Sequence, residues 1–191
     1  MTDVKMAQYW QVSPVDNEQS LVLAARRDPA AFGELYQRYV KQIYAYLYTN
    51  LGNQAETEDL TTQVFLSAWR GLSRYNERGA FKSWLFRIAR NKVIDYRRKM
   101  KVDLPLEDDL LKAGNDWDPL KHLEQAEDLK RLALVVKKLP AEQMEYLRLR
   151  FIGGLSYVQI GNVVGKREDA VRMAITRLLA RLREELERDD E

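Results

Sequence analysis

Apolar residues recur at three- and four-residue steps, the repeat of an α-helix, in three successive segments between Phe32 and Tyr96. The first segment carries one stripe, made of Phe32, Leu35, Tyr36, Tyr39, Ile43 and Leu47. The second follows Gly52 and carries two neighbouring stripes, which are Leu60, Val64, Ala68 and Leu72, and Thr61, Phe65 and Trp69. The third carries Leu85, Ile88, Ala89, Val93 and Tyr96. The pattern predicts long helices, the second with two apolar faces.

Helical spacing returns in the C-terminal part and predicts one helix, or a broken pair, that ends near Pro140. Its apolar members are Leu120, Leu123, Leu129, Leu132, Val136 and Leu139. Pro140 can itself begin the next helix at its first turn. No stretch alternates apolar and polar residues between turn signals, so no β-sheet is predicted. The predicted fold class is all-α, with two helical domains joined by a flexible acidic linker.

A net charge of +2 conceals a strong asymmetry along the chain. Between Lys82 and Lys101 a single acid, Asp95, faces a run of cations: Lys82, Arg87, Arg90, Lys92, Arg97, Arg98, Lys99 and Lys101. Such a basic stretch suits a polyanion. The next stretch is acidic and contains Pro105, Gly114 and Pro119. Its acids, opposed only by Lys112, are Asp103, Glu107, Asp108, Asp109, Asp116 and Asp118. This stretch is interpreted as the linker.

The composition argues against an enzyme. The chain has no cysteine and one histidine, His122, which removes thiolate zinc sites and most histidine acid–base chemistry. The paired acids Glu58 and Asp59, and likewise Asp108 and Asp109, are interpreted as helix-face and linker charges. No phosphate-cradling glycine loop, metal-ligand spacing or activated nucleophile occurs. No catalytic residue, metal or cofactor is predicted.

Apolar runs are short and interrupted by charge, and residues 1–13 contain no apolar block of the signal-peptide type. The sequence therefore predicts a cytoplasmic protein without membrane insertion. The residues before Leu21, including Tyr9, Trp10 and Pro14, are interpreted as a floppy tail, with an aromatic docking peptide as the alternative.

A helix-turn-helix pattern begins after Gly153 and Gly154, which stop the preceding helix. Ser156 and Gln159 have the spacing of a capping box, which begins a short helix that ends at Gly165. Within it, Gly161 stands where two helices must approach closely. Residues 166–169 then begin a second helix with acids in its first turn.

The second helix of this pattern is a candidate DNA reader, because arginine forks can read guanine edges or clamp phosphates. The apolar positions Val171, Ala174, Ile175, Leu178 and Leu182 leave other faces free. Those faces carry Arg167, Arg172, Met173, Thr176, Arg177 and Arg181. A helical hairpin with solvated arginines would show the same pattern.

A second candidate site is the loop from Ser73 to Trp84, which contains Gly79 and leads into the basic helix. Aromatic residues beside cations suit stacking on unpaired bases. The alternative is that Phe81, Trp84 and Phe86 fill the core of a three-helix bundle. At least one of them is expected to do only that.

Several segments together resemble the extracytoplasmic-function sigma factors, group IV of the sigma-70 family of RNA polymerase subunits. AFGELYQRYVKQIYAYL, EDLTTQVFLSAW and RGAFKSWLFRIARNKVIDYRRK are similar to the first domain of that family, and LPAEQMEYLRLRFIGGLSYVQIG and AVRMAITRLLARLRE to its second. The resemblance spans almost all of Leu21 to Leu186. It implies an N-terminal extension (1–20), a sigma-2-like domain (21–101), a linker (102–118) that threads the RNA-exit path, and a sigma-4-like domain (119–188).

The resemblance implies a protein that binds core RNA polymerase and directs promoter recognition and initiation at a stress- or signal-responsive regulon. The residues that would contact the clamp helices of the largest subunit are Asp59, Leu60, Gln63, Phe65 and Trp69. Those that would open and hold the minus-ten element are Asn76, Ala80, Phe81, Ser83, Trp84, Arg87, Arg90, Asn91, Arg97 and Arg98. The minus-thirty-five element would be read by Arg172, Met173, Thr176 and Arg177, with Arg167 and Arg181 beside them. Opening needs only tighter binding of the melted state.

The sequence departs from the family pattern at three positions. Gln63 stands where an acid is usual, which favours weaker clamp binding and suggests that phosphorylation of Thr61 or Thr62 by a Ser/Thr kinase supplies the missing charge. Lys166 replaces a more usual apolar residue and Gly161 a more usual alanine, so the second domain is expected to be less rigid than is typical.

Two other functions compete with the sigma factor. One is a stand-alone regulator that binds duplex DNA without polymerase, and the other is an enzyme. The partners expected of a sigma factor are core RNA polymerase and promoter DNA, with an anti-sigma factor or a kinase as candidate regulators and no small-molecule substrate.

Overall fold

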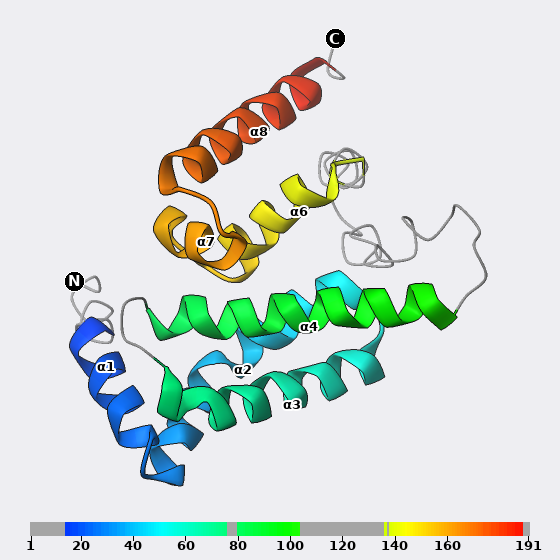
Figure 1. Cartoon of the computed structure of the whole chain (residues 1–191). Coiled ribbons are helices and arrows are strands. Elements are labelled where there is room, and N and C mark those ends of the chain that lie inside the picture. Colours follow the sequence, from blue (N-terminus) through cyan, green and yellow to red (C-terminus); the bar gives the residue numbers. More distant parts are fainter. Residues whose placement is uncertain (1–13, 76–79, 104–135, 137, 189–191) are drawn as a thin grey trace, which may run out of the picture.

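The computed structural model describes residues 14–75, 80–103, 136 and 138–188, and the described segments contain helices and turns but no strand (Figure 1). The predicted linker lies outside these residues except for 102 and 103, which continue a helix. Most of the helix expected over residues 120–139 also lies outside them. The all-α fold class is confirmed.

The first part of the chain forms four α-helices and a short 3₁₀ turn. They are α1 (Pro14–Ala25), α2 (Pro29–Leu51), α3 (Gln54–Gly71), η2 (Leu72–Arg74) and α4 (Phe81–Asp103). The three long helices expected from the apolar stripes are α2, α3 and α4. Local capping sets their ends, because Asn53 accepts a hydrogen bond from Glu56 N and Gly52 takes the left-handed conformation (φ 70°) after α2.

Helix α1 begins inside the stretch that the sequence predicts to be a floppy tail. Its residues Leu21, Val22 and Ala25 are buried, and this apolar contact orders the helix against α2. The Tyr39 hydroxyl donates a hydrogen bond to the Glu18 carboxylate, and burial is the main reason that the pKa of Tyr39 is raised. Residues 14–20 are thus part of the folded unit.

The second part contains α6 (Ala141–Leu147), a π-helical turn η5 (Arg148–Ile152), α7 (Tyr157–Val164) and α8 (Glu168–Arg188). The predicted capping box is confirmed, since Ser156 Oγ accepts from Gln159 N and the Gln159 side chain accepts from Ser156 N. Gly165 ends α7 at φ 74°. The predicted close approach at Gly161 is also confirmed, because a Cβ there would lie 2.5 Å from the Lys166 carbonyl oxygen.

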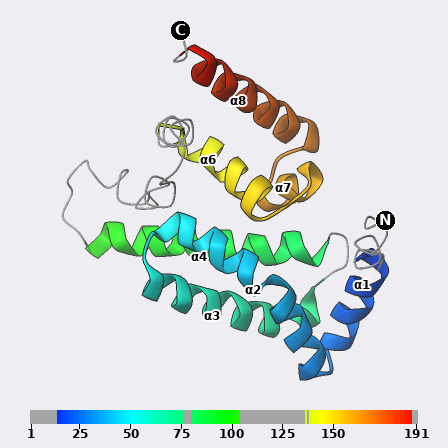
Figure 2. The ribbon, with the colours of Figure 1, turned by 180° about the vertical axis from the view of Figure 1, so that it is seen from behind.

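The two parts pack against each other. Figures 1 and 2 show α7 lying beside α4, with α3 on the opposite side of that helix, and α2 contacts both α4 and the η5 turn of the second part. One cluster of buried apolar side chains runs through both parts, from Ile43 and Phe86 to Leu149 and Ile160. A smaller cluster joins α6 to α8 through Met144 and Leu178. The apolar pattern along the chain did not indicate this arrangement.

Candidate nucleic-acid and polymerase interfaces

The second helix of the helix-turn-helix, α8, presents the predicted DNA-reading residues to solvent. Val171, Ile175 and Leu178 are buried, and this inward stripe orients the helix. The six candidates on its other faces and at its start are all exposed: Arg167, Arg172, Met173, Thr176, Arg177 and Arg181. Four of these six exposed side chains are arginines.

Some arginines of this surface are paired with acids of their own helix. Arg172 lies 2.6 Å from the Asp169 carboxylate, and Arg181 lies 3.7 Å from that of Glu185. Exposed pairs of this kind contribute little to stability, about 0.3–0.5 kcal/mol at helical spacing. The arginines can therefore exchange these partners for DNA at small cost.

The turn between α7 and α8 is tied to α6 by Lys166, one of the departures from the family pattern. The Glu142 carboxylate accepts hydrogen bonds from the Lys166 ammonium and from the Tyr146 hydroxyl, the latter at 2.7 Å. The bond from Lys166 is the main reason that the pKa of Glu142 is lowered. Lys166 therefore makes a polar contact at a position where the family commonly has an apolar one.

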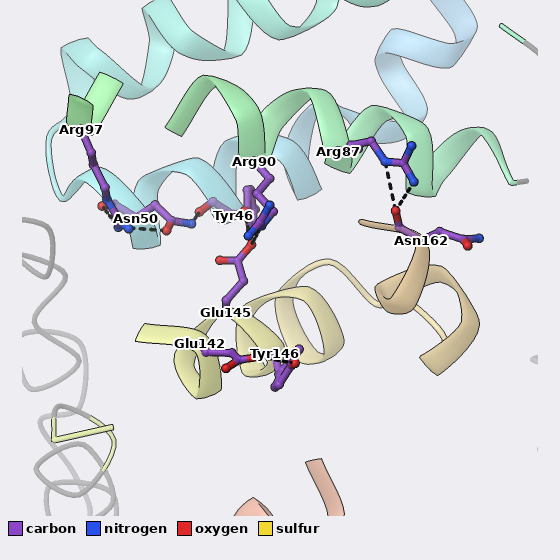
Figure 3. Close-up of polar contacts among 9 residues, drawn as sticks. All are labelled: Tyr46, Asn50, Arg87, Arg90, Arg97, Glu142, Glu145, Tyr146 and Asn162. Atoms are coloured by element: carbon purple, nitrogen blue, oxygen red, sulfur yellow. Dashed lines mark hydrogen bonds and ion pairs between the residues drawn. The ribbon is translucent and has the colours of Figure 1, made fainter. Parts of the chain in front are cut away.

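The basic helix α4 directs three of its cations toward the second part of the chain, and Figure 3 shows two of them, Arg87 and Arg90. Lys82 Nζ donates to the Gly154 carbonyl at 3.1 Å, and Arg87 Nε donates to the Asn162 carbonyl at 3.0 Å. Arg90 Nε lies 3.6 Å from the Glu145 carboxylate. Two predicted DNA contacts, Arg87 and Arg90, therefore bind acceptors within the chain itself.

The other predicted polar contacts of α4 have different surroundings. Arg97 Nη2 donates to the backbone carbonyl and the side-chain oxygen of Asn50, both at 3.2 Å, and so caps the C-terminal end of α2. Arg98 is exposed beside Asp95, and Asn91 is exposed. The sequence did not indicate the capping role of Arg97.

Aromatic residues at the start of α4 form an interior cluster. Phe81 contacts Tyr39, Tyr75 and Trp84, with ring centroids 5.5–5.9 Å apart, and it is 2% exposed. Ser83 is buried and its hydroxyl donates to the Ala80 carbonyl, and Phe86 is fully buried. Phe81 and Phe86 are therefore core residues, as the alternative interpretation of these aromatics predicted. Trp84 and Ala80 are partly exposed, and Asn76 lies outside the described residues.

Helix α3 divides the five predicted polymerase contacts between its two sides. Leu60 and Phe65 are 4% exposed and belong to the core. Asp59 is exposed and accepts a hydrogen bond from the Gln63 amide at 2.7 Å, and Trp69 is 39% exposed. Sequence reasoning missed Leu66, which is 49% exposed, although it lies three residues after Gln63 and thus on the same face. We call Asp59, Thr62, Gln63, Leu66 and Trp69 the outer face of α3.

The two candidate phosphorylation sites also differ in exposure. Thr61 is buried and its hydroxyl donates to the Thr57 carbonyl at 2.7 Å. Thr62 is exposed on the outer face of α3, with its hydroxyl 3.0 Å from the Glu58 carbonyl.

Within the described segments, no helix is long and apolar enough to cross a membrane, and no three His, Cys, Asp or Glu residues are grouped to hold a metal ion.

A helix-turn-helix whose second helix exposes arginines, packed on a helical unit with a basic helix, is the architecture of a DNA-binding transcription protein. The family model for sigma-70 region 2 matches residues 35–101, and that for sigma-70 region 4 matches residues 135–184. The chain belongs to the sigma-70 family and is an extracytoplasmic-function sigma factor. It is a non-enzymatic subunit that binds RNA polymerase and directs promoter-specific transcription initiation.

Two proteins that are similar in sequence to this chain are extracytoplasmic-function sigma factors. The chain is 35% identical to the extracytoplasmic-function sigma factor BldN of Streptomyces coelicolor over 80% of its own length and 60% of the length of BldN. It is 28% identical to SigM of Bacillus subtilis over 78% of its own length and 91% of that of SigM. Among solved structures, CnrH in complex with the cytosolic domain of CnrY superposes with a TM-score of 0.66, at 25% identity, over 90% of this chain and 98% of CnrH.

Proposed function

We propose that this sigma factor binds core RNA polymerase through the outer face of α3, grips the minus-ten element with α4, and reads the minus-thirty-five element with α8. The observation that carries the proposal is the exposure of all six candidate residues on α8 and at its start. The sigma-2-like domain of the proposal spans residues 21–101, preceded by the first turns of α1, and the sigma-4-like domain spans 119–188. The protein would act in the cytoplasm, where bacterial promoters are transcribed.

Run-off transcription with purified bacterial core polymerase tests this division of labour, using promoters selected from fragmented host genomic DNA. We expect Arg172→Ala/Arg177→Ala to lose initiation at promoters that need the minus-thirty-five element and to keep core binding, since each arginine that reads a base contributes about 1–3 kcal/mol. Arg27→Ala removes an exposed arginine near α1 and is the control. Unchanged initiation by the double variant would refute the role of α8.

We extend the proposal to an anti-sigma partner. CnrH was solved with the cytosolic domain of CnrY, and RpoE of Bartonella quintana, which shares the fold at a TM-score of 0.60 and 20% identity, was solved with the anti-sigma factor NepR. A chain of the same fold offers comparable helical surfaces. Co-purification with a candidate partner, followed by loss of core binding, is the measurement that tests this part.

A Ser/Thr kinase is proposed as a second regulator, acting on Thr62 because Thr61 is buried. A phosphate at Thr62 would add negative charge beside Gln63, where the family usually has an acid. We expect Thr62→Glu and Gln63→Glu each to raise the affinity for core polymerase about tenfold, equivalent to about 1.4 kcal/mol. Titration of labelled core measures this, with Thr62→Gln as the uncharged control. Full transcription by the unmodified protein would rule out phosphorylation as the switch.

A further inference from the structure

Helix α1 and the turn after it are joined to the end of η2 and to the start of α4. The Arg26 guanidinium, just after α1, donates a hydrogen bond to the Tyr75 carbonyl at 2.7 Å, across 49 positions of the chain. The Glu18 carboxylate on α1 accepts from the Tyr39 hydroxyl, and the Tyr39 ring centroid lies 5.8 Å from that of Phe81, the first residue of α4. A hydrogen bond from a charged donor is stronger than one between neutral groups. Arg26 therefore fixes the place where the chain leaves η2.

The turn that carries Arg26 is itself anchored. The Arg26 backbone N–H donates to the Leu23 carbonyl at 3.3 Å, and that of Asp28 donates to the Ala24 carbonyl at 2.9 Å. The Asp28 side chain then caps α2 by accepting from Ala30 N at 2.8 Å. Because the helices on both sides hold this backbone, the Arg26 side chain reaches across from a fixed point.

Tyr75 connects this anchor to Trp84, one of the residues predicted to hold the minus-ten element. Tyr75 is 9% exposed, and its ring centroid lies 4.8 Å from that of Trp84 and 5.9 Å from that of Phe81. A Cβ on Gly71 would lie 3.2 Å from Trp84 Cζ2, so the indole also packs against the end of α3. Trp84 is nevertheless only partly buried, so part of its ring lies at the surface. A side chain packed in this way is held in one orientation.

We propose that Arg26 is a positioning residue for the minus-ten element: it holds Tyr75, and Tyr75 holds the Trp84 indole in the orientation that stacks on an unpaired base. The inference rests on the proposed role of α4 at that element. Stacking on an aromatic ring favours binding most when the ring is already ordered, because ordering a free side chain on binding costs entropy. Arg26 contributes to DNA binding in this way without touching DNA.

The test uses holoenzyme reconstituted from core polymerase and the full chain. The probe is a labelled single-stranded DNA that carries the minus-ten sequence of a promoter at which wild-type holoenzyme initiates in run-off transcription. Fluorescence anisotropy gives the affinity of wild type, Arg26→Ala, Trp84→Ala and the double variant. The matched control is Arg27→Ala, which removes the same charge at the next position, also exposed. Circular dichroism confirms that each variant is folded.

We expect Arg26→Ala to lower the affinity for the probe about tenfold, the effect of losing one hydrogen bond from a charged group. Arg27→Ala should lower it less than about twofold, because an exposed charge at a distance is screened by salt. In the Trp84→Ala protein, Arg26→Ala should cost less than about twofold, since the ring through which it acts is absent. The slope of log affinity against log salt should stay at the wild-type value in Arg26→Ala, whereas loss of a direct phosphate contact would reduce it by about 0.7.

Four results would each overturn the inference: unchanged affinity in Arg26→Ala, equal losses in Arg26→Ala and Arg27→Ala, additive losses in the double variant, or a reduced salt slope. Core binding and run-off initiation by the same wild-type preparation keep the two proposals distinct. If wild type initiates and Arg26→Ala binds the probe equally well, Arg26 has no positioning role and the sigma function stands. If wild type does not bind core, the proposed polymerase role is wrong and this inference fails with it.

Discussion

Leu66→Asp is expected to lower the affinity for core RNA polymerase by more than about thirtyfold, equivalent to about 2 kcal/mol, the loss typical of a central interface residue. Leu66 is 49% exposed on the outer face of α3, between Gln63 and Trp69. An aspartate there would place an unpaired charge in the contact. Because the side chain lies at the surface, the free energy of unfolding should change by less than about 0.5 kcal/mol.

Fluorescence titration of labelled core polymerase measures the affinity, and thermal unfolding by circular dichroism measures the stability. The matched control is Leu23→Asp, since Leu23 is 44% exposed on α1 and outside the proposed contact. The control should bind core as wild type does. Equal affinity of the two variants would show that the outer face of α3 is not the polymerase contact.

Gly161→Ala is expected to destabilise the helix-turn-helix by about 1–3 kcal/mol, the usual effect of overpacking a close contact. The added Cβ would lie 2.5 Å from the Lys166 carbonyl oxygen. That oxygen is a backbone atom, so no side-chain rotation can relieve the contact. The turn must then open, which displaces α8 and its arginines. Initiation at promoters that need the minus-thirty-five element should fall more than core binding does.

Gly33→Ala is the control for this substitution. Gly33 also lies inside a helix, α2, but a Cβ there would meet nothing within 4 Å. Alanine is the better helix former, so this variant should gain about 0.5–1 kcal/mol. Chemical unfolding of both variants gives the two free energies. A stable Gly161→Ala protein would mean that the turn can relax without displacing α8.

Local signals in the sequence predicted the elements well. The apolar stripes indicated the long helices α2, α3 and α4, because one buried face per helix imposes the helical repeat. The Ser156 and Gln159 capping box and the left-handed Gly165 indicated the ends of α7, because capping depends on neighbours a few residues away. The apolar stripe of α8 likewise predicted its exposed surface, because the polar and charged residues between the apolar positions must lie on the faces that are not buried.

Individual side chains on a two-faced helix were harder to assign. Leu60 and Phe65 were predicted as polymerase contacts but are core residues, while Leu66 is at the surface. A second apolar stripe can face either a partner or the remainder of the fold, and the packing of Tyr36 on Phe65 decides this, at a centroid distance of 4.7 Å. Phe81 is ambiguous in the sequence for the same reason, and its contacts with Tyr39 and Tyr75 assign it to the core.

The long helices α2, α3 and α4, the caps of α7, the helix-turn-helix and the family could be predicted without a structure, since each follows from residues close together in the chain. Helix α1 and the capping of α2 by Arg97 could not. How the two parts meet could not. The contact of Glu145 with Tyr46 joins residues 99 positions apart, and that of Asn162 with Arg87 joins residues 75 positions apart. The periodicity of the sequence does not identify such pairs, because any exposed acid or carbonyl could accept a hydrogen bond from a cation. The packing of the whole chain decides which acceptor lies within reach.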